Sequence, residues 1–258
     1  TTVQGQGSLG TNQFLVGGAA TMINNGTISA NQAGRTLTVG TTGSGVTTLT
    51  NNSLMEAKNG ATLTVNPANW SNGATGQVNA LAGSTVNLNG AWTNGGQLNV
   101  TGGTLNLGGT FTVGALGTLA NTGGTVNLTG VLDNTGTTLT LNNTTGSLTL
   151  NTGRINNGTV QQTGVNGLRF NSSGSNILDN VLVKGDLDLS GTSNRVTFLN
   201  NTVVQTEAGG APGVINVTGQ SAILSYDGTA GWARTLTNTT INLGNNVSNS
   251  GFLTVERD

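Results

Sequence analysis

The chain has 258 residues with a formal net charge of −1, and 7% of them are charged, against about 25% in average soluble proteins. The absence of histidine and cysteine excludes an imidazole base, a thiolate nucleophile, a disulfide framework and a thiolate metal site. No basic cluster and no apolar run of roughly 20 residues occurs, so we expect no cofactor, no nucleic-acid partner and no membrane insertion.

The N-terminal residues 1–21 differ from the rest of the chain. They consist of turn-forming residues and one apolar segment, Phe14-Leu15-Val16. No helix is indicated here. We therefore predict that residues 1–21 are an N-terminal cap or docking segment that precedes a repetitive region.

One strand-and-turn phrase then returns about every 21 residues, with small insertions and deletions. Residues 59–132 contain no ionisable side chain at all. A second phrase, Trp70-Ser-Asn-Gly and Trp92-Thr-Asn-Gly, repeats at a similar interval. Two phases with one period indicate a repeat architecture. The first apolar residue of the main phrase falls at Leu37, Leu63, Val86, Leu105, Val126, Leu148, Leu168 and Leu187.

Within each phrase, apolar and polar residues alternate. In residues 62–65, Leu63 and Val65 face one way while Thr62 and Thr64 face the other, as in a β-strand. No segment shows a sustained helical stripe. We predict buried columns formed by Leu63, Val65, Val86, Leu88, Leu105, Leu107, Val126 and Leu128. Short strands are predicted at 97–100, 104–107, 110–113, 125–128, 138–141 and 147–150.

Short one-sided strands cannot bury their apolar faces as isolated hairpins, but they can when each period forms one coil and the coils stack. The pattern predicts an all-β fold, a right-handed parallel β-solenoid (β-helix) of about 12 coils of roughly 21 residues. We expect residues 1–258 to form a single solenoid domain. Asparagines at the corners can hydrogen-bond from coil to coil, and asparagine is also a common turn residue, so we expect both roles to apply.

Phrases such as Gly102-Gly-Thr-Leu-Asn-Leu107 and Ile23-Asn-Asn-Gly-Thr27 resemble the β-helical passengers of bacterial autotransporters and filamentous-haemagglutinin-like adhesins. The resemblance extends from about Met22 to Val255. It implies secretion to the bacterial cell surface and a structural or adhesive role. It implies no particular activity, because those families share composition more than they share sites. The Asn-Pro-Asn-Gly-type secretion signature is lacking.

The best catalytic or metal candidate is Lys184-Gly-Asp186-Leu-Asp188. With Leu187 inward, Asp186 and Asp188 share the outer face about 7 Å apart. Such a pair can bind calcium or serve a polysaccharide lyase or hydrolase, with Asp179 and Arg169, roughly one coil earlier, stacked nearby. Alternatively, the two carboxylates only solvate a strand. We expect no metal site and no enzymatic activity.

Two further patterns admit a binding function. Trp70 and Trp92 are candidate glycan-stacking platforms, or they are rings buried one above the other. Thr-x-Thr pairs resemble the ice-binding faces of β-helical antifreeze proteins, or they are the ordinary outward residues of neutral strands. The pairs are Thr36/Thr38, Thr62/Thr64, Thr110/Thr112, Thr138/Thr140 and Thr235/Thr237.

The C-terminal residues 251–258 contain one more apolar strand, Phe252-Leu253-Thr-Val255, which we predict to be a docking strand. No capping helix is visible at either terminus. We therefore expect copies to join head to tail through Phe14, Leu15, Val16, Phe252, Leu253 and Val255. The function expected is an extracellular structural subunit of a bacterial surface fibre or adhesin, with surface glycans as further partners. The alternatives are a carbohydrate-binding or ice-binding solenoid and, third, a polysaccharide lyase or hydrolase.

Overall fold

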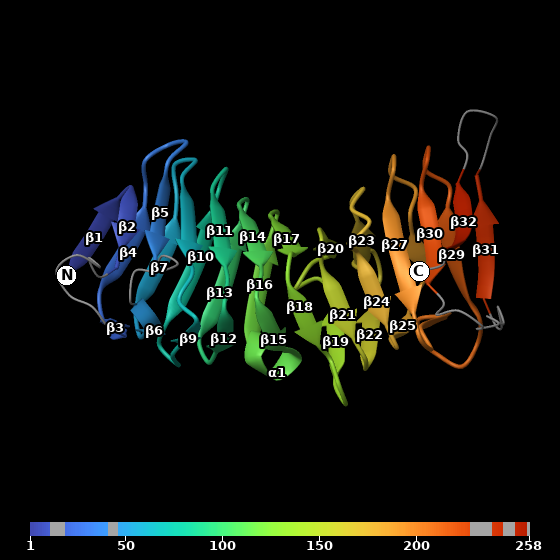
Figure 1. Ribbon diagram of the computed structural model, residues 1–258, viewed down its shortest axis with the longest axis horizontal. Helices are drawn as coiled ribbons and strands as arrows, with labels where there is room; N and C mark the ends of the chain where they lie inside the picture. The colour runs from blue at the N-terminus through green and yellow to red at the C-terminus, as the bar shows by residue number, and fades with distance from the viewer. Residues whose placement is uncertain (11–18, 41–45, 228–238, 245–250, 257–258) are drawn as a thin grey trace. The chain divides into compact units, whose positions relative to one another are not determined.

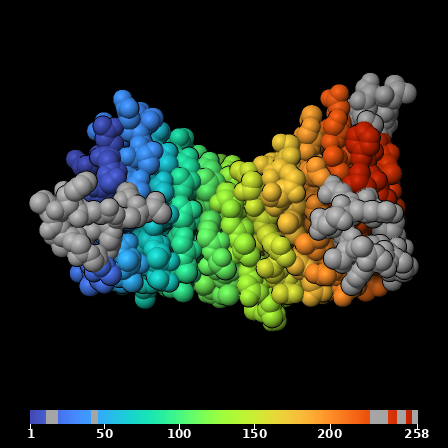
Figure 2. Space-filling view, viewed as in Figure 1, coloured from blue at the N-terminus to red at the C-terminus, as the bar shows by residue number. Residues whose placement is uncertain are grey.

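The computed structural model describes residues 1–10, 19–40, 46–227, 239–244 and 251–256 (Figure 1). Phe14, Leu15, Val16, Thr235 and Thr237 lie outside these ranges. The chain folds as an all-β parallel solenoid of about nine turns. It divides into two compact units, Thr1–Gly130 and Val131–Asp258. Figure 2 shows that successive turns within each unit pack directly on one another.

Three parallel sheets, A, B and C, form the first unit, and each turn contributes one strand to each sheet. Sheet A has the order β1 (Thr2–Gly5), β4 (Thr27–Ala30), β7 (Leu54–Ala57), β10 (Gln77–Leu81), β13 (Gln97–Thr101) and β16 (Thr118–Thr122). Sheet B has the order β2 (Gly7–Leu9), β5 (Thr36–Val39), β8 (Thr62–Val65), β11 (Thr85–Leu88), β14 (Thr104–Leu107) and β17 (Thr125–Leu128). Sheet C has the order β3 (Ala20–Asn24), β6 (Val46–Asn51), β9 (Asn69–Asn72), β12 (Ala91–Asn94) and β15 (Thr110–Thr112).

The second unit is built in the same way from sheets D to G, all parallel. Sheet D has the order β18 (Val131–Asp133), β21 (Arg154–Asn156), β24 (Ile177–Asp179), β27 (Arg195–Leu199), β30 (Ile223–Asp227) and β32 (Phe252–Glu256). Sheet E has the order β19 (Thr138–Leu141), β22 (Thr159–Gln162), β25 (Leu182–Lys184) and β28 (Val203–Gln205). Sheet F contains β20 (Leu148–Leu150) and β23 (Leu168–Phe170), and sheet G contains β26 (Leu187–Asp188), β29 (Gly213–Val217) and β31 (Thr239–Leu243).

The predicted apolar columns are confirmed in sheet B. Leu63 pairs with Val86, Val86 with Leu105, and Leu105 with Val126, so the four side chains stack in register. All eight residues predicted to point inward are at most 1% exposed. The period-two alternation therefore places the core here, since every second residue of β8, β11, β14 and β17 enters the same interior.

The uniform coil of 21 residues is not confirmed, because the turns differ in length. Asn87 and Asn106, matched in neighbouring turns, are 19 residues apart, whereas Asn24 and Asn51 are 27 apart. In the second unit, Ser225 and Thr254 are 29 apart. In sheet B the strands nevertheless pair in continuous register from turn to turn. Longer turns at both ends of the chain account for fewer turns than 12.

A four-residue helix, α1 (Val113–Leu116), replaces the end of the strand predicted at 110–113. The strand ends at Thr112, whose Oγ1 accepts a hydrogen bond from Ala115 N at 3.0 Å and so caps the helix. A local side-chain cap therefore ends the alternating pattern one residue early.

A column of buried asparagines, the asparagine ladder, runs along the inner end of sheet C. It consists of Asn24, Asn51, Asn72 and Asn94, all at most 7% exposed. The Nδ2 of each donates to Oδ1 of the next, at 2.6, 2.6 and 2.7 Å. The same Nδ2 atoms also donate to backbone carbonyls. Of the two interpretations for corner asparagines, coil-to-coil hydrogen bonding holds here.

Candidate functional site

The acidic pair lies in the second unit, at strand β26. Asp186 Oδ1 accepts from Val214 N of the next turn at 2.8 Å, and Asp188 Oδ1 accepts from Ser190 N at 2.9 Å. Each carboxylate thus accepts a hydrogen bond from a backbone N–H group and fixes the position of that backbone segment. No cluster of three or more acidic, histidine or cysteine side chains suited to a metal ion occurs among the described residues.

Of the two residues expected to stack near this pair, Asp179 lies elsewhere and Arg169 lies close to it. Asp179, on sheet D, accepts from Arg154 Nη2 at 2.5 Å and from Asn200, and is therefore committed elsewhere. Arg169 does lie near Asp186, because both line one polar hollow that Glu207 also lines. No sequence pattern singles out Glu207. Three strands, β26, β27 and β28, lie between Asp186 and Glu207 along the chain, so no local motif joins them.

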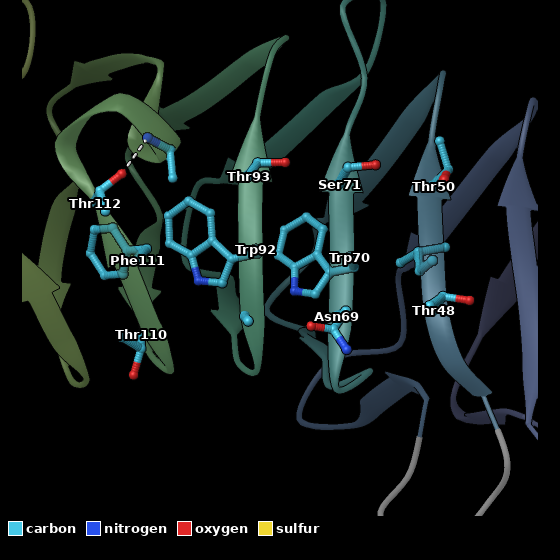
Figure 3. Close-up of a pocket in the computed structure, with 13 residues that line it drawn as sticks. Thr48, Thr50, Asn69, Trp70, Ser71, Trp92, Thr93, Thr110, Phe111 and Thr112 are labelled. Carbon is cyan, nitrogen blue, oxygen red and sulfur yellow. Dashed lines mark hydrogen bonds between the residues drawn. The ribbon is translucent and has the colours of Figure 1, made fainter.

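The tryptophans stand on sheet C (Figure 3). Trp70 and Trp92 pair in register, and their ring centroids are 5.8 Å apart. Phe111 continues the column at 4.5 Å from Trp92. The three side chains are 5, 3 and 4% exposed, and both indole N–H groups donate to corner carbonyls, at 2.8 Å for Trp70 and 3.0 Å for Trp92. The rings are thus buried one above the other, and no face is free to stack on a sugar.

A furrow of about 540 Å³ lies on this part of sheet C. Besides the aromatic column, Thr48, Thr50, Ser71 and Thr93 line it, and all carry uncharged polar groups (Figure 3). The furrow offers hydroxyl groups but neither a charge nor an accessible aromatic face. It has the chemistry of an ordinary polar sheet surface.

The Thr-x-Thr pairs fall on three different sheets. Thr36/Thr38 and Thr62/Thr64 stack in register on sheet B, whereas Thr110/Thr112 and Thr138/Thr140 lie on sheets C and E. On sheet B the first threonine of the pair is matched by a threonine in each following turn. The second threonine is matched by an asparagine from Asn87 onward. The threonine column is Thr36, Thr62, Thr85, Thr104 and Thr125.

The side chains matched to the second threonine of the pair form a chain of hydrogen bonds along the surface of sheet B. Asn87 Nδ2 donates to Thr64 Oγ1 at 3.1 Å, Asn106 to Asn87 at 2.7 Å and Asn127 to Asn106 at 2.8 Å. These amides bond to one another from turn to turn. The outer face of sheet B is therefore regular and uncharged, and much of its hydrogen-bonding capacity is used internally.

Of the expected assembly residues, Phe252, Leu253 and Val255 lie on β32, which pairs with β30. Phe252 is 46% exposed, and Leu253 is partly buried. Strand β32 has a described partner on one side only, as have β1, β2 and β3 in the first unit. Backbone groups on the other side of each of these strands have no described partner, which makes them candidate pairing edges.

One carboxylate of the second unit has a perturbed titration. The pKa of Asp133 is lowered because Thr135 Oγ1 donates to its Oδ1 at 2.6 Å, and Thr135 N donates to the same oxygen at 3.1 Å. The side-chain bond is the larger cause. A lowered folded-state pKa stabilises the fold above the unfolded pKa, and this contribution is lost as the pH falls through the folded value.

Replacing Thr135 with Val is expected to raise the pKa of Asp133 toward its ordinary value, because the stronger of the two bonds to the carboxylate disappears. Titration of the Asp133 carboxyl carbon by NMR measures the shift. The Thr137→Val variant is the control, since Thr137 Oγ1 bonds to Asn134. An unchanged pKa of Asp133 in Thr135→Val would contradict the assignment.

Among the described residues, no helix is long and apolar enough to cross a membrane. No protein-family model, curated protein or solved structure shows significant similarity to this chain.

Proposed function

We propose that this chain is a structural, non-enzymatic β-solenoid subunit of a bacterial surface fibre or adhesin, whose copies join end to end into filaments. The proposal includes right-handed winding, because parallel crossovers are overwhelmingly right-handed. The carrying observation is the position of the exposed apolar side chains. Five large ones are exposed among the described residues, and four lie on the first or last strand of a sheet: Ile23, Val203, Leu243 and Phe252.

Exposed apolar groups at a strand edge favour association, because burying them removes apolar surface from water. The first unit offers three strand edges, β1, β2 and β3, and the second unit offers β28, β31 and β32. The backbone groups on the open side of each edge have no partner among the described residues, and another parallel strand can pair with them. Docking of one copy's last strands on the next copy's first strands satisfies both edges at once.

Such a contact joins two different surfaces and therefore does not close on itself, so it propagates into a filament. The neutral outer faces support a structural role, because residues 59–132 have no charge with which to position a substrate. A surface location and an adhesive role follow from the resemblance to bacterial β-helical exoproteins.

Replacing Phe252 with Asp is expected to suppress filaments, because docking would bury a charge without a partner. We expect the concentration needed for assembly to rise at least about a hundredfold, equivalent to about 2.7 kcal/mol. Light scattering over a concentration series and electron microscopy measure the change.

Val165→Asp is the matched control. Val165 is 83% exposed in a corner loop away from the terminal strands, so this variant should assemble as the wild type does. A wild-type chain that stays monomeric at high concentration would refute end-to-end assembly, and so would equal assembly by Phe252→Asp.

A further inference from the structure

Three successive corners of the second unit differ in length. Strands β22, β25 and β28 are neighbours in sheet E. The corner after β22 contains residues 163–167, the corner after β25 contains only 185–186, and the corner after β28 contains 206–212. The short middle corner between two longer ones leaves a hollow of about 460 Å³, within the size range of small-molecule sites.

Gly185 keeps the middle corner short. Its φ is +113°, and a Cβ there would lie 2.8 Å from the Cβ of Gln162. Gln162 is 6% exposed, and its amide holds both neighbours: Nε2 donates to the Asp186 carbonyl at 3.0 Å, and Oε1 accepts from Leu168 N at 2.7 Å. The floor of the hollow is therefore fixed by a buried side chain that bonds to the corners on both sides.

The two longer corners are also tied in place. Arg169 Nη2 donates to the Val165 carbonyl at 3.1 Å, which secures the 163–167 corner. The 206–212 corner is closed by Thr206 N donating to the Ala211 carbonyl at 3.0 Å. Gln161 Nε2 reaches across to the Glu207 carbonyl at 3.1 Å, 46 residues away. Both walls thus have defined positions before any ligand arrives.

The lining gathers three charged residues, Arg169, Asp186 and Glu207, in a chain that is 7% charged. Asp186 uses Oδ1 to accept from Val214 N, and Glu207 has no side-chain hydrogen bond within the described part of the chain. Carboxylate oxygens accept from hydroxyl groups, while the guanidinium and amide N–H groups donate to them. The hollow therefore presents both donors and acceptors to a ligand.

We propose that this hollow binds a sugar residue of an uncharged polysaccharide. A hydroxylated ring both donates and accepts, which suits Asp186, Glu207 and Arg169 together. Two carboxylates repel a phosphate or a uronate. Val165 exposes an apolar side chain at the rim that can cover the C–H face of a ring. Gly164 has open space where a side chain would stand, so a ring can approach the wall closely there.

The test is isothermal titration calorimetry of the full chain with cellohexaose, mannohexaose and N-acetylchitohexaose, with hexagalacturonate as the acidic comparison. We expect at least one neutral hexasaccharide to bind, and hexagalacturonate to bind more weakly. Failure of all three neutral sugars to bind, or tighter binding of hexagalacturonate, overturns the proposal. Binding is independent of filament formation, so this result and that of the assembly test are separate.

Asp186→Asn and Glu207→Gln are each expected to weaken binding about tenfold or more, because each removes a charged acceptor. An asparagine can still accept from Val214 N, so the backbone contact is kept. Asp188→Asn is the matched control, since Asp188 bonds to Ser190 N and does not line the hollow. We expect its affinity to equal that of the wild type.

Val165→Ala tests the apolar contact at the rim separately from the carboxylates. A side chain that is 83% exposed contributes little to folding, so the variant should keep the fold. We expect a several-fold loss of affinity with an unchanged far-ultraviolet circular dichroism spectrum. Unaltered affinity in both Glu207→Gln and Val165→Ala overturns the proposal, and so does an equal loss in Asp188→Asn.

Discussion

Replacing Leu105 with Asp is expected to lower the free energy of unfolding by about 4 kcal/mol or more. Leu105 is 1% exposed and stacks between Val86 and Val126 of the neighbouring turns. A carboxylate there would be buried between coils, against the apolar side chains of the turns on either side. Guanidinium denaturation followed by circular dichroism measures the loss.

Thr104→Asp is the control for this experiment. Thr104 precedes Leu105 on the same strand, β14, but faces outward and is partly exposed. The same charge placed there remains solvated, so we expect a change below about 1 kcal/mol. Similar losses in the two variants would contradict the assignment of Leu105 to the interior.

Replacing Asn72 with Ala is expected to cost about 2–4 kcal/mol, because it interrupts the asparagine ladder in a site where water cannot replace the lost bonds. Asn72 is 1% exposed. It accepts from Asn51 Nδ2 at 2.6 Å and donates to Asn94 Oδ1 at 2.7 Å and to the Gly76 carbonyl at 3.1 Å. The same denaturation experiment measures the loss.

The matched control is Asn99→Ala. Asn99 also sits beside an asparagine of the neighbouring turn, donating to Asn79 Oδ1 at 2.9 Å, but it lies on the outer face of sheet A and is partly exposed. Because water can replace that bond, we expect less than about 1 kcal/mol. If Asn99→Ala costs as much as Asn72→Ala, burial does not determine the strength of the ladder.

The strands and the core could be predicted from sequence because both depend on local alternation. Leu105 and Leu107 are separated by one polar residue, and that spacing alone decides which side each one faces. The same rule applies to Trp70, whose neighbours Asn69 and Ser71 are polar. Alternation along the strand therefore favours an inward Trp70. The interval between Trp70 and Trp92, by contrast, fits both a glycan-stacking platform and a buried column of rings.

Turn length and the polar hollow could not be predicted in this way. Both depend on how many residues each corner absorbs, and inserted residues leave the strand phrase unchanged. The hollow needs three corners from three turns, and the contact between Gln161 and Glu207 joins residues 46 apart. No short motif spans such a distance, so Glu207 emerges only when the turns are stacked.

The asparagine ladder also bears on how the protein ages. Asn72 and Asn94 each precede a glycine, the neighbour that least hinders spontaneous loss of ammonia from an asparagine side chain. That reaction begins when the next backbone nitrogen attacks the side-chain amide carbon. Here Gly73 N and Gly95 N each donate to the preceding turn at 2.7 Å, and the amides are held in the ladder. The folded solenoid thus protects its two buried Asn-Gly sites from the deamidation that would occur in the unfolded chain.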